Sequence, residues 1–173
     1  MEEKTEDNLT DVAAIQRDTL EKLRPHFIFN TLNAIRYQMK EQPEAAYDMV
    51  YDLGKYLRGS CKAIVGKEWI PVEEELGFAK AYARLEEIQK NRLTVSWQVL
   101  SDDGWVEAGS IYTAVEALLK QEVYTSREPR TLVVTGDREQ SLIRVYIKEN
   151  GKELVIPVQK EKGKTEEELK VTG

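Results

Sequence analysis

The chain has 173 residues, of which 41% are hydrophobic and 32% are charged. That length corresponds to one domain or two small ones, and the composition is typical of a soluble globular protein. Its 25 basic and 31 acidic side chains give a net charge of −6. Because a negative chain repels phosphate backbones, we expect no nucleic-acid partner.

The side chains used for metal and disulfide chemistry are scarce. Cys61 is the single cysteine and His26 the single histidine, so neither an intramolecular disulfide nor the usual zinc ligand set can be assembled. The acidic N-terminus lacks the apolar segment of a signal peptide, and no apolar run approaches the roughly 18 residues that span a bilayer. We therefore expect a cytoplasmic location, no metal site and no membrane contact by this segment itself.

The first third of the chain predicts a helical hairpin over residues 8–66. Apolar residues recur at helical intervals over 8–39, which predicts one long helix that Pro25 bends about one turn before the proline. A second amphipathic helix is expected after Pro43, ending within 59–66. Two such helices expose more apolar surface than they can cover, which predicts pairing with a second copy. The expected interface consists of Leu20, Leu23, Ile28, Leu32, Ile35, Met49, Leu53 and Leu57.

Residues 67–158 predict a small α+β domain, and residues 159–173 a charged, mobile tail. Pro71, at the expected first helical position, and three glutamates at 73–75 predict the start of a helix that stops near Asn91. The later elements follow from a change between helical and strand periodicity. They are a strand over 93–99, a turn over 101–104, a helix over 105–123, and strands over 131–135, 142–147 and 154–158, the last two joined by a hairpin turn at Asn150-Gly151.

The most informative segment is RPHFIFNTLN, residues 24–33. On a helix, His26, Asn30 and Asn33 share one stripe, and the apolar Phe27, Ile28 and Leu32 are expected to face the core. An exposed imidazole is a suitable nucleophile because one ring nitrogen is unprotonated at physiological pH and can attack phosphorus, with Asn30 orienting the ring. A lone histidine is more often without catalytic function, so spacing alone leaves both interpretations open.

This segment resembles the phosphoacceptor stretch PHFxFNxLN of the LytS-like sensor histidine kinases. Two further stretches resemble other parts of that family: YDLGKYLRGS, with the pair Leu57-Arg58, and IPVEEELGFAKAYARLEEIQKNRL, with Tyr82 and Arg92. The resemblance is close over residues 20–100 and loose over 101–155. It implies an α+β fold in which a dimerisation and histidine-phosphotransfer hairpin precedes a Bergerat-type ATPase domain, an α/β sandwich.

The resemblance also implies a function. His26 would be the phosphoacceptor, assisted by Asn30, and the phosphoryl group would pass to an aspartate of a response-regulator receiver domain. ATP and Mg²⁺ would be the cofactors. The chain would act as a homodimer and form the cytoplasmic part of a membrane-anchored sensor.

The implied nucleotide residues lie on two stretches. The first, VEALLKQE at 115–122 (the box), matches a family sequence that reads roughly VENAIKHG. Glu116 and Lys120 are kept, but Ala117 stands where the family has the asparagine that holds magnesium. An alanine side chain offers no oxygen ligand to that cation.

The second stretch, ENGKE at 149–153 (the ENGKE turn), matches a DNGxG turn whose aspartate accepts the adenine amino group. Glu149 and Gly151 are the kept positions, and Glu153 replaces the second glycine and is expected to face the phosphates. A plain hairpin turn explains this stretch equally well. The family's glycine-rich lid has no counterpart in this sequence.

Three functions therefore stay open. The first is a sensor histidine kinase that autophosphorylates His26 with ATP. The second is a pseudokinase, a dimeric signalling scaffold that has lost ATP binding. The third keeps His26 as a phosphoacceptor that another kinase supplies.

Overall fold

The structure, a computed structural model, describes residues 21–66, 68–99, 103–137 and 139–163. The helices within these residues are α2 (Pro25–Glu41), α3 (Pro43–Val65), α4 (Val72–Gln89) and α5 (Ser110–Leu118), with a π-helical turn η1 (Leu119–Val123) directly after α5. The strands are β1 (Trp69–Pro71), β2 (Leu93–Val99), β3 (Trp105–Glu107), β4 (Arg130–Asp137), β5 (Leu142–Ile147) and β6 (Glu153–Pro157). The beginning of the expected first helix and the end of the tail lie outside the described residues.

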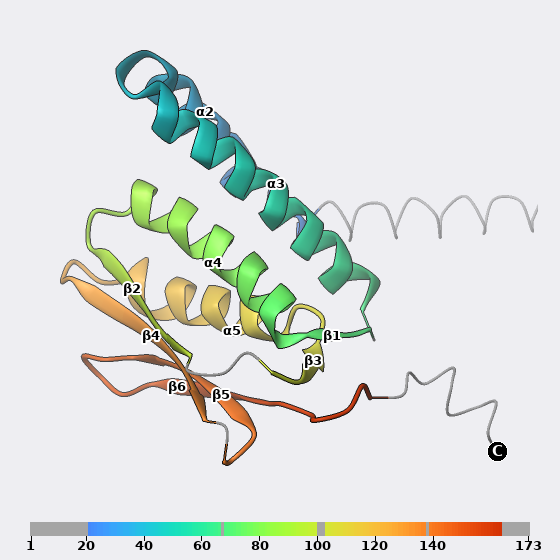
Figure 1. The fold of residues 1–173 in the computed structure, drawn as a ribbon. Helices are drawn as coiled ribbons and strands as arrows, with labels where there is room; N and C mark the ends of the chain where they lie inside the picture. The colour runs from blue at the N-terminus through green and yellow to red at the C-terminus, as the bar shows by residue number, and fades with distance from the viewer. Residues whose placement is uncertain (1–20, 67, 100–102, 138, 164–173) are drawn as a thin grey trace, which may run out of the picture.

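The elements form three layers (Figure 1). One layer is a sheet with strand order β2-β4-β5-β6, in which β2 and β4 are parallel and the other neighbours antiparallel. Helices α4 and α5 cover one face of this sheet, and the α2–α3 hairpin packs on α4. Strands β1 and β3 pair as a separate antiparallel ribbon. The predicted α+β class, with a helical hairpin ahead of a mixed α/β region, is thus confirmed.

The first expected helix is interrupted at Arg24, not bent one turn earlier. Arg24 has φ +52° and ψ +69°, which is left-handed backbone, and α2 begins with Pro25. A proline disfavours helical conformation in the residue before it and has no amide to donate. The helix therefore breaks directly ahead of the proline, and the expected position of the bend was wrong.

Two other expectations are corrected by strand pairing. Residues of β3, expected to be helical, pair with β1, and the following helix begins only after Gly109. Gln159, expected in a mobile tail, exchanges backbone hydrogen bonds of 2.8 and 2.9 Å with Trp105. A third correction is that Pro71 lies at the N-cap of α4 and not at its first helical position.

The three tryptophans, Trp69, Trp97 and Trp105, lie one each on β1, β2 and β3.

Four aromatic rings connect the layers. They are Phe27 of α2, Tyr56 of α3, Tyr82 of α4 and Tyr112 of α5. Tyr56 and Tyr82 contact each other and both of the other rings, with centroids 4.9–5.8 Å apart. Each such pair contributes about 0.5–1.5 kcal/mol beyond the apolar area that it buries. One hydrophobic core therefore runs from the hairpin through α4 and α5 to the sheet.

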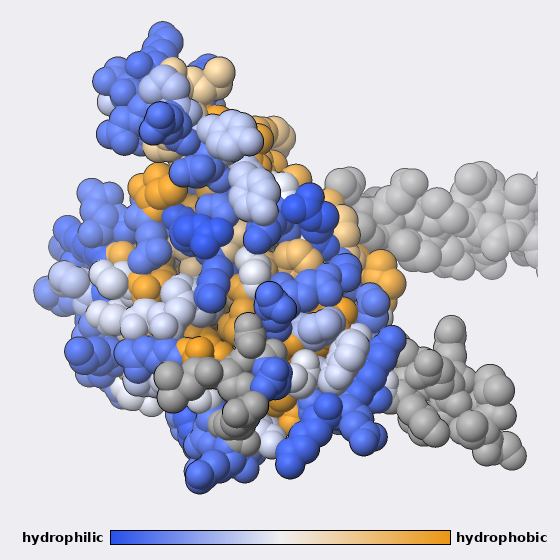
Figure 2. All heavy atoms as spheres, in the orientation of Figure 1, coloured by the Kyte–Doolittle hydropathy of each residue, from blue (hydrophilic) through white to orange (hydrophobic). Residues whose placement is uncertain are grey.

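This core contains part of the expected dimer interface. Ile35, Met49 and Leu53 are buried inside the protomer, because α4 covers the inner side of the hairpin, so they cannot contact a second copy. Leu32, expected to face the core, is 47% exposed. The large hydrophobic side chains that the hairpin leaves exposed are Phe29, Leu32, Tyr37, Met39, Tyr47, Val50, Tyr51 and Val65. Figure 2 shows pale and orange residues among the blue ones along the hairpin.

Gly59 of α3 packs tightly against Phe78 of α4. A Cβ atom there would lie 2.6 Å from Cγ of Phe78, whereas one at Gly54, on the same helix, would meet only the guanidinium of Arg58 at 3.9 Å. Overpacking costs about 1–3 kcal/mol, and replacing a helical glycine by alanine gains up to about 1 kcal/mol. The two glycines thus offer a matched pair of substitutions.

We expect Gly59→Ala to lower the free energy of unfolding by about 1–2 kcal/mol, because steric overlap with Phe78 outweighs the gain in helix propensity. Gly54→Ala should leave stability equal or slightly higher. Urea denaturation of the two variants beside the parent chain measures both effects. A stabilised Gly59→Ala would mean that α3 and α4 are further apart than described.

Candidate functional site

His26 and Asn30 lie on the first two turns of α2, and both are exposed. The carboxamide nitrogen of Asn30 is 3.2 Å from Nδ1 of His26. The helix is continuous between them, since Pro25 occupies the first turn, where its missing amide costs nothing. Asn33 is exposed one turn further on, and Phe27 enters the core between His26 and Ile28. The helix thus presents the imidazole and two carboxamides to solvent while Phe27 anchors it.

The contact with Asn30 determines which nitrogen of the imidazole is free. In a neutral ring one nitrogen carries the proton and the other a lone pair. With the amide nitrogen of Asn30 facing Nδ1, Nδ1 accepts and Nε2 carries the proton. When the carboxamide turns by half a rotation, its oxygen accepts a hydrogen bond from a protonated Nδ1, and Nε2 holds the lone pair. Asn30 can therefore select the tautomer in which Nε2 is a nucleophile.

The box lies on α5 and η1, with its two retained polar residues bonded to each other. Glu116 accepts from Nζ of Lys120 at 2.7 Å, and a second ion pair of 3.2 Å joins Glu116 to Nε of Arg24. A shallow groove of about 350 Å³ follows this side of the helix and is lined by residues of α5 and η1, Ala117 among them. Glu116 and Lys120 are thus already engaged in ion pairs with residues of the same chain.

Glu75 of α4 holds the start of α5. Its carboxylate is 1% exposed and accepts hydrogen bonds from the amides of Gly109 at 3.0 Å and Tyr112 at 3.1 Å. Burial raises the pKa of Glu75, and these backbone amides oppose the rise. Gly109 has φ +85°, and a Cβ there would lie 2.4 Å from Cβ of Ala63, so only glycine fits where α5 begins. Glu75 was expected to be a helix-start charge of α4 alone, and it also caps the box helix.

In the ENGKE turn the polar side chains bond to the chain itself. Both oxygens of Glu149 are 2.9 Å from the amide nitrogen of Thr131, which donates to them. Asn150 donates to Oε2 of Glu122 at 2.5 Å, and Lys152 forms an ion pair with the same carboxylate. That bond to Lys152 lowers the pKa of Glu122. Gly151 has φ +72°, as the turn requires.

The sequence predicts that Glu153 faces the phosphates of a nucleotide at the box, and this prediction is wrong. Glu153 is the first residue of β6, and its carboxylate is 3.2 Å from the guanidinium of Arg144 on β5. Side chains alternate across a sheet, and Ile156 of β6 faces the helices. Glu153 therefore lies on the opposite, outer face of the sheet, away from α5.

The residues present do not fit a magnesium nucleotide between the box and the ENGKE turn. Ala117 supplies no oxygen for the cation. Glu149, which would accept the adenine amino group, is engaged by a backbone amide. Glu122 joins the box to the turn through Asn150 and Lys152, so the chain's own side chains connect the two stretches that would have to admit the ligand.

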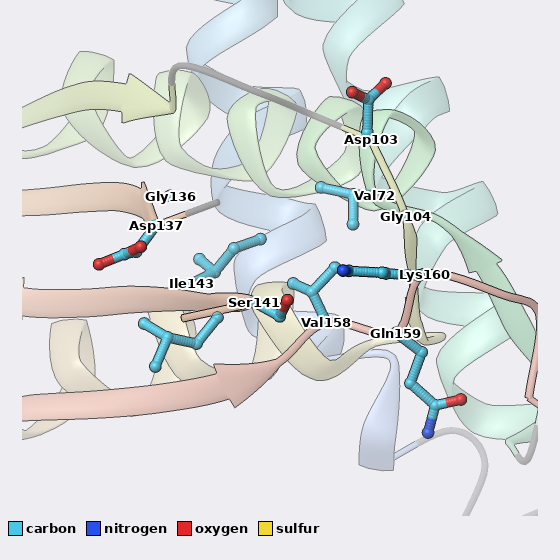
Figure 3. A pocket seen from close by; sticks show the side chains of 11 residues that line it. Val72, Asp103, Gly104, Gly136, Asp137, Ser141, Ile143, Val158, Gln159 and Lys160 are labelled. Carbon is cyan, nitrogen blue, oxygen red and sulfur yellow. The ribbon is translucent and has the colours of Figure 1, made fainter. Parts of the chain in front are cut away.

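A cavity of about 290 Å³ lies at the other end of the sheet (Figure 3). It is formed where β4 ends, β5 begins and the chain leaves β6. Figure 3 shows its two carboxylates, Asp103 and Asp137, projecting in different directions, so they do not form an acid/base pair. The predicted His26, box and ENGKE residues do not line this cavity.

The described part of the chain holds no group of three or more His, Cys, Asp or Glu side chains placed to bind a metal ion. Among the described helices, none combines the length and apolarity that crossing a bilayer requires.

Comparison with known proteins supports the resemblance. Residues 15–93 match the family described as Histidine kinase. The chain is 31% identical over 133 residues to the sensor protein LytS of Enterococcus faecalis, which covers 75% of this chain and 22% of that protein. It is 31% identical over 93 residues to the sensor histidine kinase YpdA of Escherichia coli, covering 53% and 16%. It is 29% identical over 87 residues to the sensor protein kinase HptS of Staphylococcus aureus, covering 50% and 16%.

The chain thus spans 16–22% of the length of these relatives. The matched region contains His26, Asn30 and the helices that hold them. Together with the LytS-like segment at residues 24–33, these matches show a histidine kinase domain over residues 15–93 and distant homology of the chain to the sensor histidine kinases LytS, YpdA and HptS.

Proposed function

We propose that His26 is a phosphoacceptor that receives its phosphoryl group from a donor other than this chain's own box and passes it to an aspartate of a response-regulator receiver domain. The observation that supports acceptance is the exposed imidazole with Asn30 at 3.2 Å from Nδ1. The observation that supports an external donor is the bridge from Glu122 to Asn150 and Lys152. In this proposal residues 8–66 form the phosphotransfer hairpin, 67–158 a degenerate ATPase-like domain and 159–173 a tail, all in the cytoplasm.

For phosphoryl transfer the protein has to hold the imidazole of His26 in position and keep it in the tautomer in which Nε2 has the lone pair. The lone pair on Nε2 attacks the phosphorus, a P–N bond forms, and the bond from phosphorus to the donor's leaving group breaks with its electron pair. The proton on Nδ1 stays in place, held by the carbonyl oxygen of Asn30, which stabilises the positive charge that develops on the ring. In the second transfer an aspartate oxygen attacks the same phosphorus and His26 leaves as a neutral imidazole.

The hairpin suits such a carrier because its reactive group lies on a rigid element. Phe27 is buried against two tyrosines, Tyr56 and Tyr82. Thr31 donates to the carbonyl of Phe27 at 2.9 Å and accepts from Gln89 of α4 at 3.0 Å. These contacts fix the turn of α2 that carries His26 and leave the ring on the solvent side. A partner can therefore approach His26 without any change in the core.

Treatment with potassium phosphoramidate, a small phosphoryl donor, should phosphorylate the parent chain on His26. The product should be acid-labile and alkali-stable, and mass spectrometry should find it absent from His26→Gln. Asn30→Ala should slow the reaction about tenfold or more, because the tautomer with Nε2 free loses its support; that factor corresponds to about 1.4 kcal/mol. Asn33→Ala, one turn away on the same face, is the matched control and should react at the parent rate.

The outcomes separate the three functions. Phosphorylation by phosphoramidate but not by Mg-ATP alone supports the proposal. Labelling of His26 by Mg-ATP alone would instead establish an autophosphorylating kinase. Failure with both donors would point to a signalling scaffold that has lost phosphotransfer.

Calorimetric titration with Mg-ATP should detect no binding at tens of micromolar ligand. The lost oxygen at position 117 costs on the order of 1–3 kcal/mol, which is about one to two decades of affinity. The engaged Glu149 and Glu122 weaken the site further. Ala117→Asn alone should not restore binding, because the bridge to the ENGKE turn remains. A low-micromolar dissociation constant for the parent chain would overturn this expectation.

We further propose that two copies of the chain pair through the outer side of the hairpin. Phe29 and Leu32 of α2 and Tyr47, Val50 and Tyr51 of α3 are exposed hydrophobic side chains on this side. An apolar surface of this kind on a soluble protein marks an interaction site. This set replaces the buried Ile35, Met49 and Leu53 of the original expectation.

Sedimentation should show a dimer at tens of micromolar, and Leu32→Glu combined with Val50→Glu should convert it to a monomer. Each side chain contributes about 1.5–3 kcal/mol when buried, so the pair weakens association by two decades or more. Leu154→Glu, on the exposed part of β6, is the control and should stay dimeric. A monomeric parent chain at these concentrations would contradict the proposed pairing.

A further inference from the structure

The break ahead of the phosphoacceptor helix is held by specific hydrogen bonds. The carbonyl oxygen of Leu23 accepts a hydrogen bond of 3.2 Å from the hydroxyl of Tyr56 on α3. The amide of Arg24 donates to the carbonyl of Glu21 at 3.2 Å, and the carbonyl of Arg24 accepts from the amide of Ile28 at 3.2 Å. The chain thus changes direction at one residue, with its freed backbone groups satisfied.

The side chain of Arg24 contacts residues of several other elements. The guanidinium of Arg24 donates to the hydroxyl of Tyr82 at 2.7 Å and forms an ion pair with Glu116 at 3.2 Å. It lies 3.9 Å from Glu86 and 3.5 Å from the hydroxyl of Tyr124, and packs over the ring of Phe27 at 5.2 Å. The side chains of Arg24 and Glu116 are 17% and 14% exposed, so water screens this ion pair less than a surface pair.

The backbone conformation of Arg24 does not explain why an arginine occupies this position, whereas its side-chain contacts do. A φ of +52° is unfavourable for arginine by about 1 kcal/mol or more, and glycine would adopt it freely. Burial alone would lower the pKa of Arg24, but Tyr82, Tyr124 and Glu116 raise it, so the group stays charged. An arginine here is explained by what its guanidinium contacts on α4 and α5.

We propose that Arg24 is a clamp between the two halves of the chain: the residue that turns the chain into the phosphoacceptor helix also holds Glu116 of the box. A change in the backbone conformation of Arg24 would move its guanidinium and thereby disturb the Arg24–Glu116 ion pair. Loss of that ion pair would leave Glu116 of the box paired with Lys120 alone and remove the direct link from Arg24 to α5. This coupling does not depend on whether His26 accepts a phosphoryl group.

Hydrogen exchange measured by mass spectrometry tests the clamp in the full chain. Arg24→Gln should speed exchange at least tenfold in two separate segments, 25–30 of α2 and 110–118 of α5, and leave β5 unchanged. Arg24→Gly should behave like Arg24→Gln although it relieves the backbone. Glu116→Gln should affect the same two segments, and the double variant should be no worse than Arg24→Gln alone, because the Arg24–Glu116 ion pair is already absent from that variant.

Arg84→Gln is the matched control, since Arg84 also pairs with an acid on another helix, Asp52, but away from the break. It should leave exchange in 25–30 and 110–118 at parent values. The proposal fails if Arg24→Gly retains parent exchange, because the backbone alone would then account for the break. It also fails if Arg24→Gln and Glu116→Gln affect only their own helices. If Arg24→Gln also speeds exchange in β5, general destabilisation is indicated, and Glu116→Gln decides the matter.

Discussion

The contact among Phe27, Tyr56, Tyr82 and Tyr112 determines where everything else lies, because each ring comes from a different helix. It anchors the turn of α2 next to His26, fixes α3 against α4, and reaches α5 at the residue whose amide Glu75 binds. The inner side of the α2–α3 hairpin is therefore part of the core, and only its outer side is exposed to solvent. The guanidinium of Arg24, which pairs with Glu116 of the box, also packs over two of these rings, Phe27 and Tyr82.

The parts of the site that a local pattern encodes could be predicted from the sequence. His26 and Asn30 are four residues apart on one helix, and helical geometry alone brings them within 3.2 Å. The strands of the sheet follow from alternation, and the turn before β6 from Asn150-Gly151. The break at Arg24 was only approximately predicted, since Pro25 signals an interruption but not the left-handed residue that makes it.

The remaining features depend on contacts between distant residues, and no local pattern contains them. Glu75 and Glu122 look like ordinary charges in acidic or mixed stretches, but the fold places them against the amides of α5 and the ENGKE turn. Glu153 was assigned to the wrong side because only its register in β6 determines which face of the sheet it occupies. Arg24 lay inside the recognised segment, yet its hydrogen-bond and ion-pair partners on α4, α5 and beyond are 58 to 100 residues away.

The placement of the tryptophans has a practical consequence for measuring this protein. All three lie on β1, β2 and β3, whereas the hairpin contains tyrosine and phenylalanine only. Indole fluorescence therefore reports on the strands and is blind to a hairpin that separates from α4. Near-ultraviolet circular dichroism of the clustered tyrosines would register that separation. Agreement between the two signals during denaturation would thus show that the two halves unfold as one cooperative unit.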